Sequence, residues 1–356
     1  MTIYVFIYLI VMVLAIINIT YVKKEKLRFF YVLVCIYLVM FTGLRDGLGG
    51  YDYFQYKAYF DAIPPLEDIN LLNLDFYKYE SGYTLLNSLL KSFTENSHVL
   101  FIVVSIITLG GILILNYKYS RYPFFTLQFF FYKMFLYNNF VALRQSFVIV
   151  IFIFAIKFIE KRNFKKYILC IIVSMLFHLS AIVLIPVYFI NRVDLRKVEI
   201  KKILLVCIGG FLFSDIMFDL IMSLVSLFGK TRYMNYSSGS TMAFYLNILE
   251  GLMFLFLIKK FNKMDKELEK INYNLVVLYF AITVIFMNYS FMARVTMNFI
   301  FPMILLFGDT LKYMDGRKKK IAFFLLFSFL FFAGYIRELL TFDGGSLKIY
   351  SSILFK

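Results

Sequence analysis

A few basic side chains stand apart from the basic clusters of this chain, next to long apolar runs. Arg144 and Gln145 open the run "LRQSFVIVIFIFAIKF", and Arg294 lies in "FMARVTMNF". The other members of this group are Arg45, His178, Arg232 and Arg337. A guanidinium stays protonated and can bind two phosphate oxygens at once, so several brought together would suit a pyrophosphate group. Each arginine could instead reach the lipid headgroups from a helix end, and the sequence leaves both interpretations open.

Two side chains could take a proton from an attacking hydroxyl group. His178 lies in "MLFHLSA", and an imidazole changes its charge near neutral pH. Asp52 lies in "RDGLGGYDYF", where a carboxylate could act as a general base. A lone histidine in an apolar helix is more often a buried structural group. The sequence alone does not choose between Asp52 and His178.

The segment 44–79 combines turn-forming glycines with tyrosines and acidic residues. Gly47 and Gly49 allow tight turns and a close approach of the backbone to a ligand. Tyr53 and Tyr56 alternate with acidic residues, which fits sugar binding and equally fits an aromatic belt at the membrane interface. We expect a substrate-binding group of Arg45, Gly47, Gly49, Tyr53, Tyr56, Gln145, Arg232 and Tyr233, with Arg144, Arg294, Asp52 and His178 as catalytic residues.

Membrane-spanning helices must position these residues. Hydrophobic residues make up 62% of the chain and the mean hydropathy is +0.78, whereas soluble domains are nearer to about 45–50% apolar. A span needs about 20 apolar residues, and the sequence predicts about twelve helices in one all-α membrane domain over 1–356. We expect them at 2–21, 27–43, 98–116, 123–138, 143–160, 166–178, 179–191, 201–218, 242–260, 272–289, 294–311 and 320–336.

The net charge of +16 does not indicate nucleic-acid binding, because the basic loops are too short to hold a duplex. By the positive-inside rule these loops share the cytoplasmic face, and both chain ends lie on the other. The segments 44–79 and 219–241 are then the two long external loops. Cysteines 35, 170 and 207 lie within apolar runs, and no spacing of Cys and His predicts a metal site.

The stretch 165–192 tests this orientation, because it has basic residues at both ends. A tight pair of short helices with His178 at the turn keeps both ends on one face, and one helix kinked near Pro186 is the alternative. We prefer the pair because it obeys the charge rule. The segment 80–93 is too short and polar to span, so we expect it to lie in the interface or to enter the membrane and return.

Two blocks of the sequence resemble the EpsG family. The block "GLRDGLGGYDYFQYKAYF" resembles the family's Arg-x-Gly-x-Gly-x-x-Asp-Tyr loop, and the region 143–189 resembles its central block, where Arg-Gln opens a helix and Phe-His-x-Ser-Ala follows a basic turn. The matching residues are Arg45, Gly47, Gly49, Asp52, Tyr53, Tyr56, Phe60, Arg144, Gln145, Phe177, His178, Ser180 and Ala181. The order of the blocks and the chain length also agree. Tyr51 departs from the family's small hydroxyl residue, and 80–93 has no counterpart that we can match.

The resemblance implies a Wzy-type polysaccharide polymerase of the bacterial inner membrane. Such an enzyme transfers a growing glycan from undecaprenyl pyrophosphate to the sugar end of another lipid-linked repeat, on the outer face, without a metal or cofactor. Its partners are the undecaprenyl-pyrophosphate-linked oligosaccharide and the lipid bilayer, and the resemblance also allows a chain-length regulator protein. It leaves open whether the polymer is O-antigen, capsule or exopolysaccharide.

Three other functions fit parts of the sequence. An O-antigen ligase would use the same donor with a different acceptor, but ligases of this type usually have a larger outer loop. A flippase or other transporter needs polar residues near the midplane, where Lys133 is the main exception to a nearly charge-free interior. A membrane O-acyltransferase needs a histidine with an acyl-donor route from the cytoplasm, and the sequence shows no such arrangement. We therefore rank the polymerase first.

Overall fold

Helices make up nearly all the regular structure of the chain. The computed structural model describes residues 1–226, 242–289 and 292–355, and these include an isolated β bridge between Arg45 and Ser352. Six helical segments are long and apolar enough to cross a membrane, which confirms the expected all-α membrane protein. They are α1 (Thr2–Thr20), η1 with α2 (Lys24–Leu27, Arg28–Gly43), α5 (His98–Tyr119), α13 (Glu267–Ile285), α14 through η8 to α15 (Met292–Thr296, Met297–Phe299, Ile300–Tyr313) and α16 (Arg317–Thr341).

The structure does not support the expected number of spans, because several remaining helices are short, bent or interrupted. The helices α10 (Ile200–Leu212) and α11 (Ser214–Ser226) meet at a 69° bend and would bring the total to seven if they form one span. The helix α6 (Pro123–Phe130) passes into π-helical turns, η3 (Phe131–Phe135) and η4 (Tyr137–Val141). The others are α7 (Leu143–Glu160), α8 (Phe164–Met175), η5 (Leu179–Leu184), α9 (Val187–Ile190), η6 (Leu195–Lys197) and α12 (Met242–Phe261).

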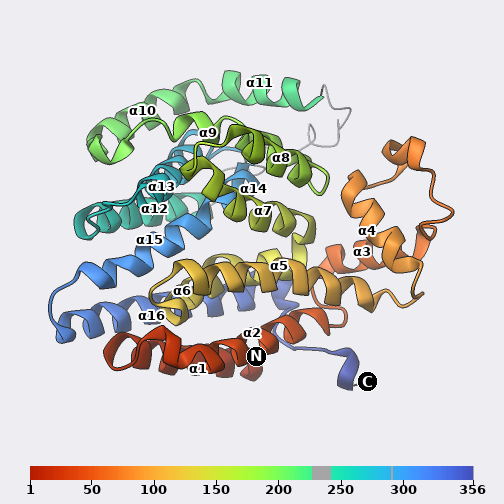
Figure 1. The fold of residues 1–356 in the computed structure, drawn as a ribbon, viewed down its shortest axis with the longest axis horizontal. Helices are drawn as coiled ribbons and strands as arrows, with labels where there is room; N and C mark the ends of the chain where they lie inside the picture. The colour runs from red at the N-terminus through yellow and green to blue at the C-terminus, as the bar shows by residue number, and fades with distance from the viewer. Residues whose placement is uncertain (227–241, 290–291, 356) are drawn as a thin grey trace.

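The expected loop at 44–79 is largely helical. It contains α3 (Gly50–Ala62) and η2 (Leu71–Phe76), and α4 (Ser81–Lys91) follows. Figure 1 shows α3 and α4 at one end of α5, on the side of the C-terminus, and we call this side the far end. The turns η9 (Phe342–Gly345) and η10 (Ile353–Phe355) belong to the C-terminal tail. The second expected loop, 219–241, begins within α11, and its residues 227–241 lie outside the described part.

The basic turns gather at the opposite side, which we call the basic end. One cavity is lined by the α1–α2 turn, the α5–α6 turn and the start of α16. A second cavity joins the α5–α6 turn to α13 and α15, and a third joins the α7–α8 turn to α13 and to Arg192. These shared cavities confirm that the basic turns lie on one face. The Met1 ammonium donates to the Lys348 carbonyl, so the start of α1 lies next to the C-terminal tail.

The segment around His178 is the expected antiparallel pair. The hydroxyl of Tyr167 in α8 donates to the carbonyl of Leu184 in η5, at 2.5 Å. The rings of Phe164 and Tyr188 lie 5.1 Å apart, so the chain returns along α8 after the turn at His178. A single helix kinked near Pro186 is therefore wrong. The second arm is not one regular helix but the 3-10 turn η5 followed by the short α9.

A buried ion pair crosses the interior between η3, which continues α6, and α12. The ammonium of Lys133, on the π-helical turn η3, pairs with the carboxylate of Glu250. Their side chains are 9% and 15% exposed. Taking two charges out of water is unfavourable unless they pair well, and removing one partner leaves an uncompensated buried charge. The midplane charge noticed in the sequence is thus neutralised by a partner from α12.

Replacing Lys133 with methionine is expected to destabilise the protein by about 3–5 kcal/mol, because Glu250 would remain buried without a cation. Melting temperature in detergent measures this change. The double variant Lys133→Met, Glu250→Leu should recover most of the loss. A matched control is Lys91→Met, whose partner Glu95 is 83% exposed and whose loss should change stability by about 0–1 kcal/mol. An equally mild effect at Lys133 would contradict the buried pair.

Candidate functional site

The first residues of α7 meet the start of α4 through an ion pair. The guanidinium of Arg144 pairs with the carboxylate of Glu80, which immediately precedes α4. Their side chains are 17% and 6% exposed, so the pair is largely shielded from water. The guanidinium also lies 4.3 Å from the ring centre of Tyr79. Arg144 is therefore fixed at the far end by a carboxylate and an aromatic face, both from the segment just before α4.

The charges of Arg144 and Arg294 act on the same two residues of α3, Asp52 and Tyr56. Burial raises the pKa of Asp52, and the nearby cations of Arg294, Arg144 and Lys78 oppose that rise. Burial likewise raises the pKa of Tyr56. A hydrogen bond with Arg144 and the charges of Arg144 and Arg294 oppose this rise. Asp52 sits in the first turn of α3, where the helix dipole favours a negative charge. Arg144, Arg294, Asp52 and Tyr56 thus converge, which the sequence could not establish.

Gln145 holds together the three segments that carry the site. Its Nε2 donates to Oδ1 of Asn298 at 3.0 Å and to the backbone carbonyl of Arg294 at 3.3 Å. Its Oε1 accepts from the Ser180 hydroxyl at 2.9 Å. The side chain is 2% exposed, and its amide is engaged at both ends. In this structure Gln145, expected to bind substrate, instead orients α7 against α14 and against the turn that carries His178.

His178 is buried at the turn between α8 and η5, with 3% of its surface exposed. Its Nδ1 accepts a hydrogen bond from the Ser180 backbone N–H at 3.2 Å. A neutral imidazole that accepts at Nδ1 carries its proton on Nε2, so it offers a donor there. The next residue, Leu179, donates its N–H to Oε1 of Glu80 at 3.4 Å, which ties this turn to the Arg144 ion pair.

Arg45 does not join the other arginines. Its side chain is fully buried, and its guanidinium donates to the carbonyls of Leu48 at 3.0 Å and Thr42 at 2.5 Å. It lies between the rings of Phe101 and Phe140, at 4.8 Å and 5.1 Å. Burial lowers its pKa to about 10. Through these contacts the Arg45 side chain stabilises the turn between α2 and α3.

Tyr53 belongs to the same structural group as Arg45. Its ring stacks on Phe101 with centroids 4.6 Å apart, and its hydroxyl donates to Oδ1 of Asp46 at 3.1 Å. Tyr56, one helical turn later in α3, points instead to the Arg144 side. Of the two tyrosines expected to bind substrate, Tyr56 therefore lies near Arg144 and Arg294, whereas Tyr53 packs against Phe101.

The glycines of this segment form the turn that starts α3. Gly47 and Gly49 have φ of +70° and +122°, a region that side-chain-bearing residues rarely adopt. A Cβ on Gly49 would lie 2.2 Å from the carbonyl oxygen of Phe140, whereas nothing lies within 4 Å of a Cβ on Gly47. The close approach that the sequence suggested is thus made to the chain's own backbone at η4.

These two glycines should differ in their response to alanine. Gly47→Ala should cost about 1–2 kcal/mol, from the unfavourable backbone conformation alone. Gly49→Ala should be clearly more destabilising, because the methyl group also collides with Phe140. Melting curves of the two purified variants in detergent check this order. Equal melting temperatures would mean that α3 does not pack on η4 as described.

Some predicted residues cannot be placed, and some important ones were not predicted. Arg232 and Tyr233 lie outside the described residues. Glu80 and Tyr79, which hold Arg144, were missed, although an acidic residue at the start of the amphipathic segment 80–93 is the kind of signal that marks a helix start. No group of three metal-ligating side chains occurs within 1–226, 242–289 and 292–355, and metal independence stays a prediction.

The arrangement suits the binding of an anionic group beside a sugar. The charges of two guanidiniums reach a half-buried carboxylate, Tyr79 packs on one of them, and the turn with the buried His178 is tied to the same ion pair through Leu179. Guanidiniums can bind the oxygens of a phosphate ester, while the carboxylate can receive a proton from a hydroxyl group. Glu80 keeps the charge of Arg144 balanced in the absence of such an anion.

Comparison with known proteins gives one match. The sequence profile of the EpsG family matches residues 28–352, nearly the whole chain. This range contains all the described residues of the candidate site. No curated protein and no solved structure matches the chain.

Proposed function

The chain belongs to the EpsG family of Wzy-like polysaccharide polymerases and glycosyltransferases, and on this premise we propose that it polymerises lipid-linked repeat units. In the proposed reaction a growing glycan leaves undecaprenyl pyrophosphate and joins the sugar end of another lipid-linked repeat. The observation that carries the proposal is the convergence of Arg144 and Arg294 on Asp52 and Tyr56. That arrangement supports the proposal because it brings positive charge for a pyrophosphate near a proton acceptor.

The bond that breaks joins C1 of the reducing-end sugar to an oxygen of the pyrophosphate. The leaving pyrophosphate keeps the electron pair, so its departure needs positive charge more than a strong acid. Arg144 and Arg294 supply that charge in our proposal, because the charges of both already act on one carboxylate, that of Asp52. Arg144 would exchange part of its contact with Glu80 for the phosphate oxygens. The developing charge is then stabilised by donors that are already in position.

The bond that forms joins the acceptor hydroxyl oxygen to C1 of the donor sugar, and the hydroxyl proton passes to a base. Asp52 is the better candidate, because burial raises its pKa and so strengthens it as a base. His178 already accepts a hydrogen bond at Nδ1, so its Nε2 would act as a donor to a phosphate or sugar oxygen. The rings of Tyr56 and Tyr79 would pack against the sugars.

The proposed site lies at the far end of the bundle, away from the basic end. By the charge rule the basic end faces the cytoplasm, which would place the far end on the outer side of the inner membrane. This location agrees with a substrate that carries its glycan outside.

A deletion strain tests the proposal. Wild-type complementation should restore a ladder of surface glycan lengths on a gel, and the deletion alone should show single repeat units. If the deletion strain instead makes long chains that never reach their final anchor, the protein is a ligase or transporter, and the polymerase proposal fails. Membrane expression of the complementing protein is checked by immunoblot.

A further inference from the structure

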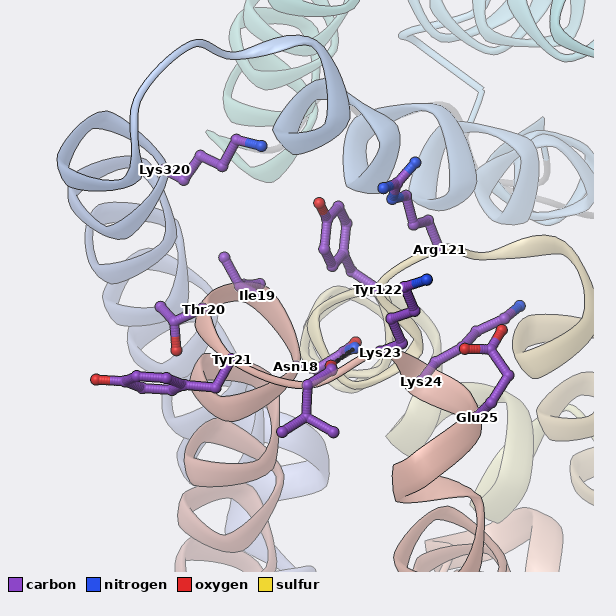
Figure 2. Close-up of a pocket in the computed structure, with 11 residues that line it drawn as sticks. Asn18, Ile19, Thr20, Tyr21, Lys23, Lys24, Glu25, Arg121, Tyr122 and Lys320 are labelled. Carbon is purple, nitrogen blue, oxygen red and sulfur yellow. Dashed lines mark hydrogen bonds between the residues drawn. The ribbon is translucent and has the colours of Figure 1, made fainter.

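A polar cavity opens at the basic end, on the opposite side of the bundle from the candidate site. It has a volume of about 490 Å³ and lies between the end of α1, the α1–α2 turn, the α5–α6 turn and the start of α16. Its charged lining consists of Lys23, Lys24, Arg121 and Lys320, with Glu25 as the carboxylate. Figure 2 shows these cations coming from three different turns, with the hydroxyl of Tyr122 between Lys320 and Arg121 in this view.

One of these cations builds the wall of the cavity, and three are available to a ligand. The Lys24 ammonium donates to the carbonyls of Tyr117 and Ser120, at 2.7 and 2.8 Å, and so fastens the α1–α2 turn to the end of α5. Within the described residues, the charged groups of Lys23, Arg121 and Lys320 make no hydrogen bond or ion pair. Arg121 also acts on the carboxylate of Asp309 in the neighbouring cavity, and the remaining positive charge around this cavity attracts an anion with several oxygens.

The start of α16 adds to the positive potential. The N-cap residue Gly316 provides no side-chain hydrogen bond, so the first N–H groups of α16 lack a cap. Such groups carry a partial positive charge. Lys320 lies within this first turn and lines the cavity.

The surroundings of the cavity are those of a lipid site. The helices α1 and α16 pack on each other and expose apolar side chains on their outer surfaces, among them Phe6, Val13 and Phe329, at 63%, 54% and 68%. Tyr21 is 74% exposed and belongs to the lining of the cavity, and the guanidinium of Arg317 lies 4.3 Å from its ring centre. Tyrosine and arginine of this kind mark the level of the lipid headgroups.

We propose that this cavity binds the phosphate headgroup of an anionic glycerophospholipid, with the acyl chains along the outer surfaces of α1 and α16. The phosphate would contact Lys23, Arg121 and Lys320, and the uncapped start of α16 would add to the attraction. Basic pockets between membrane helices at this level are suited to such headgroups. The site is independent of the glycan chemistry at the far end.

Native mass spectrometry of the full chain tests the site. The protein is placed in phosphatidylcholine nanodiscs and titrated with phosphatidylglycerol. The triple variant Lys23→Gln, Arg121→Gln, Lys320→Gln should bind phosphatidylglycerol at least about tenfold more weakly than the wild type. The matched control Lys161→Gln, Lys165→Gln, Lys166→Gln removes the same charge from the exposed α7–α8 turn and should bind like the wild type.

Two outcomes would overturn the proposal. Equal weakening in the triple and control variants would mean that only the total charge of the basic end matters. Binding of glycerol 1-phosphate as tight as that of phosphatidylglycerol, measured by calorimetry, would mean that the cavity takes a soluble phosphate and not a lipid. Melting temperatures verify that each variant is folded. If the triple variant is not folded, Arg121→Gln alone is compared with Lys161→Gln by the same titration.

Discussion

Replacing Arg144 with alanine is expected to lower polymer synthesis by about 10²–10³-fold and to leave single repeat units on a surface-glycan gel. The reason is the loss of a cation that, in our account, stabilises the departing pyrophosphate. Arg144→Lys should restore little, because an ammonium cannot bind two oxygens in the planar geometry of a guanidinium. The measurement is the glycan ladder in a deletion strain complemented with each variant, normalised to the amount of protein in the membrane.

The ion pair with Glu80 provides the control for this prediction. Arg144→Ala alone leaves a buried carboxylate without its partner, which by itself could disturb the fold. The double variant Arg144→Ala, Glu80→Gln removes that unpaired charge and should melt close to the wild type. We expect it to remain inactive. Recovery of the ladder in the double variant would show that Arg144 serves only to neutralise Glu80.

Replacing Asp52 with asparagine is expected to lower activity by about 10²–10⁴-fold, the usual contribution of a general base. Asparagine keeps the size of the side chain but cannot take the proton of the acceptor hydroxyl. Binding of the lipid-linked donor should be retained, because Arg144 and Arg294 remain. Single-turnover assays with purified protein separate the two effects. A variant that polymerises at the wild-type rate would exclude Asp52 as the base.

The pH dependence gives a second readout of Asp52. The carboxylate must be ionised to act as a base, so activity falls as the pH drops through its pKa. Burial raises this pKa, so the loss should occur at a higher pH than for an exposed aspartate. Lys78→Gln removes a cation that opposes the rise and should move the acid limb to still higher pH. Lys57→Gln changes a lysine on the same helix as Asp52 that does not contribute to this pKa shift, so this matched control should leave the limb in place.

Much of the architecture could be predicted because long apolar runs leave few choices in a bilayer. The bounds expected for α7, 143–160, agree with the structure, and the basic turns gather on one face as the charge rule requires. The number of spans could not be predicted in this way. Hydropathy does not reveal that α6 passes into π-helical turns or that α10 and α11 meet at a bend, since both features depend on packing.

The candidate site was predictable in its residue types but not in its pairing. Arg144, Arg294, Asp52 and Tyr56 stand out as polar residues near apolar runs, and they converge. Arg45 has the same sequence signal, yet tertiary packing buries it against carbonyl groups and aromatic rings. A sequence of spaced arginines cannot distinguish these two environments.

The partner of Arg144 could not be found by spacing. Glu80 lies far from Arg144 in the chain, and only the folding of α3 and α4 over the far end brings them together. The same holds for Gln145, whose amide joins α7 to α14 and to Ser180. Such links between distant segments leave no periodic pattern in the sequence.

The most direct test uses the purified protein in liposomes with a single substrate, an undecaprenyl-pyrophosphate-linked repeat unit. The account predicts that chains of several repeats form while undecaprenyl pyrophosphate is released, one molecule for each bond made. It predicts that neither product forms with the Arg144→Ala, Glu80→Gln protein. Wild-type protein that is folded in the liposomes but leaves the repeat units single would contradict the central claim.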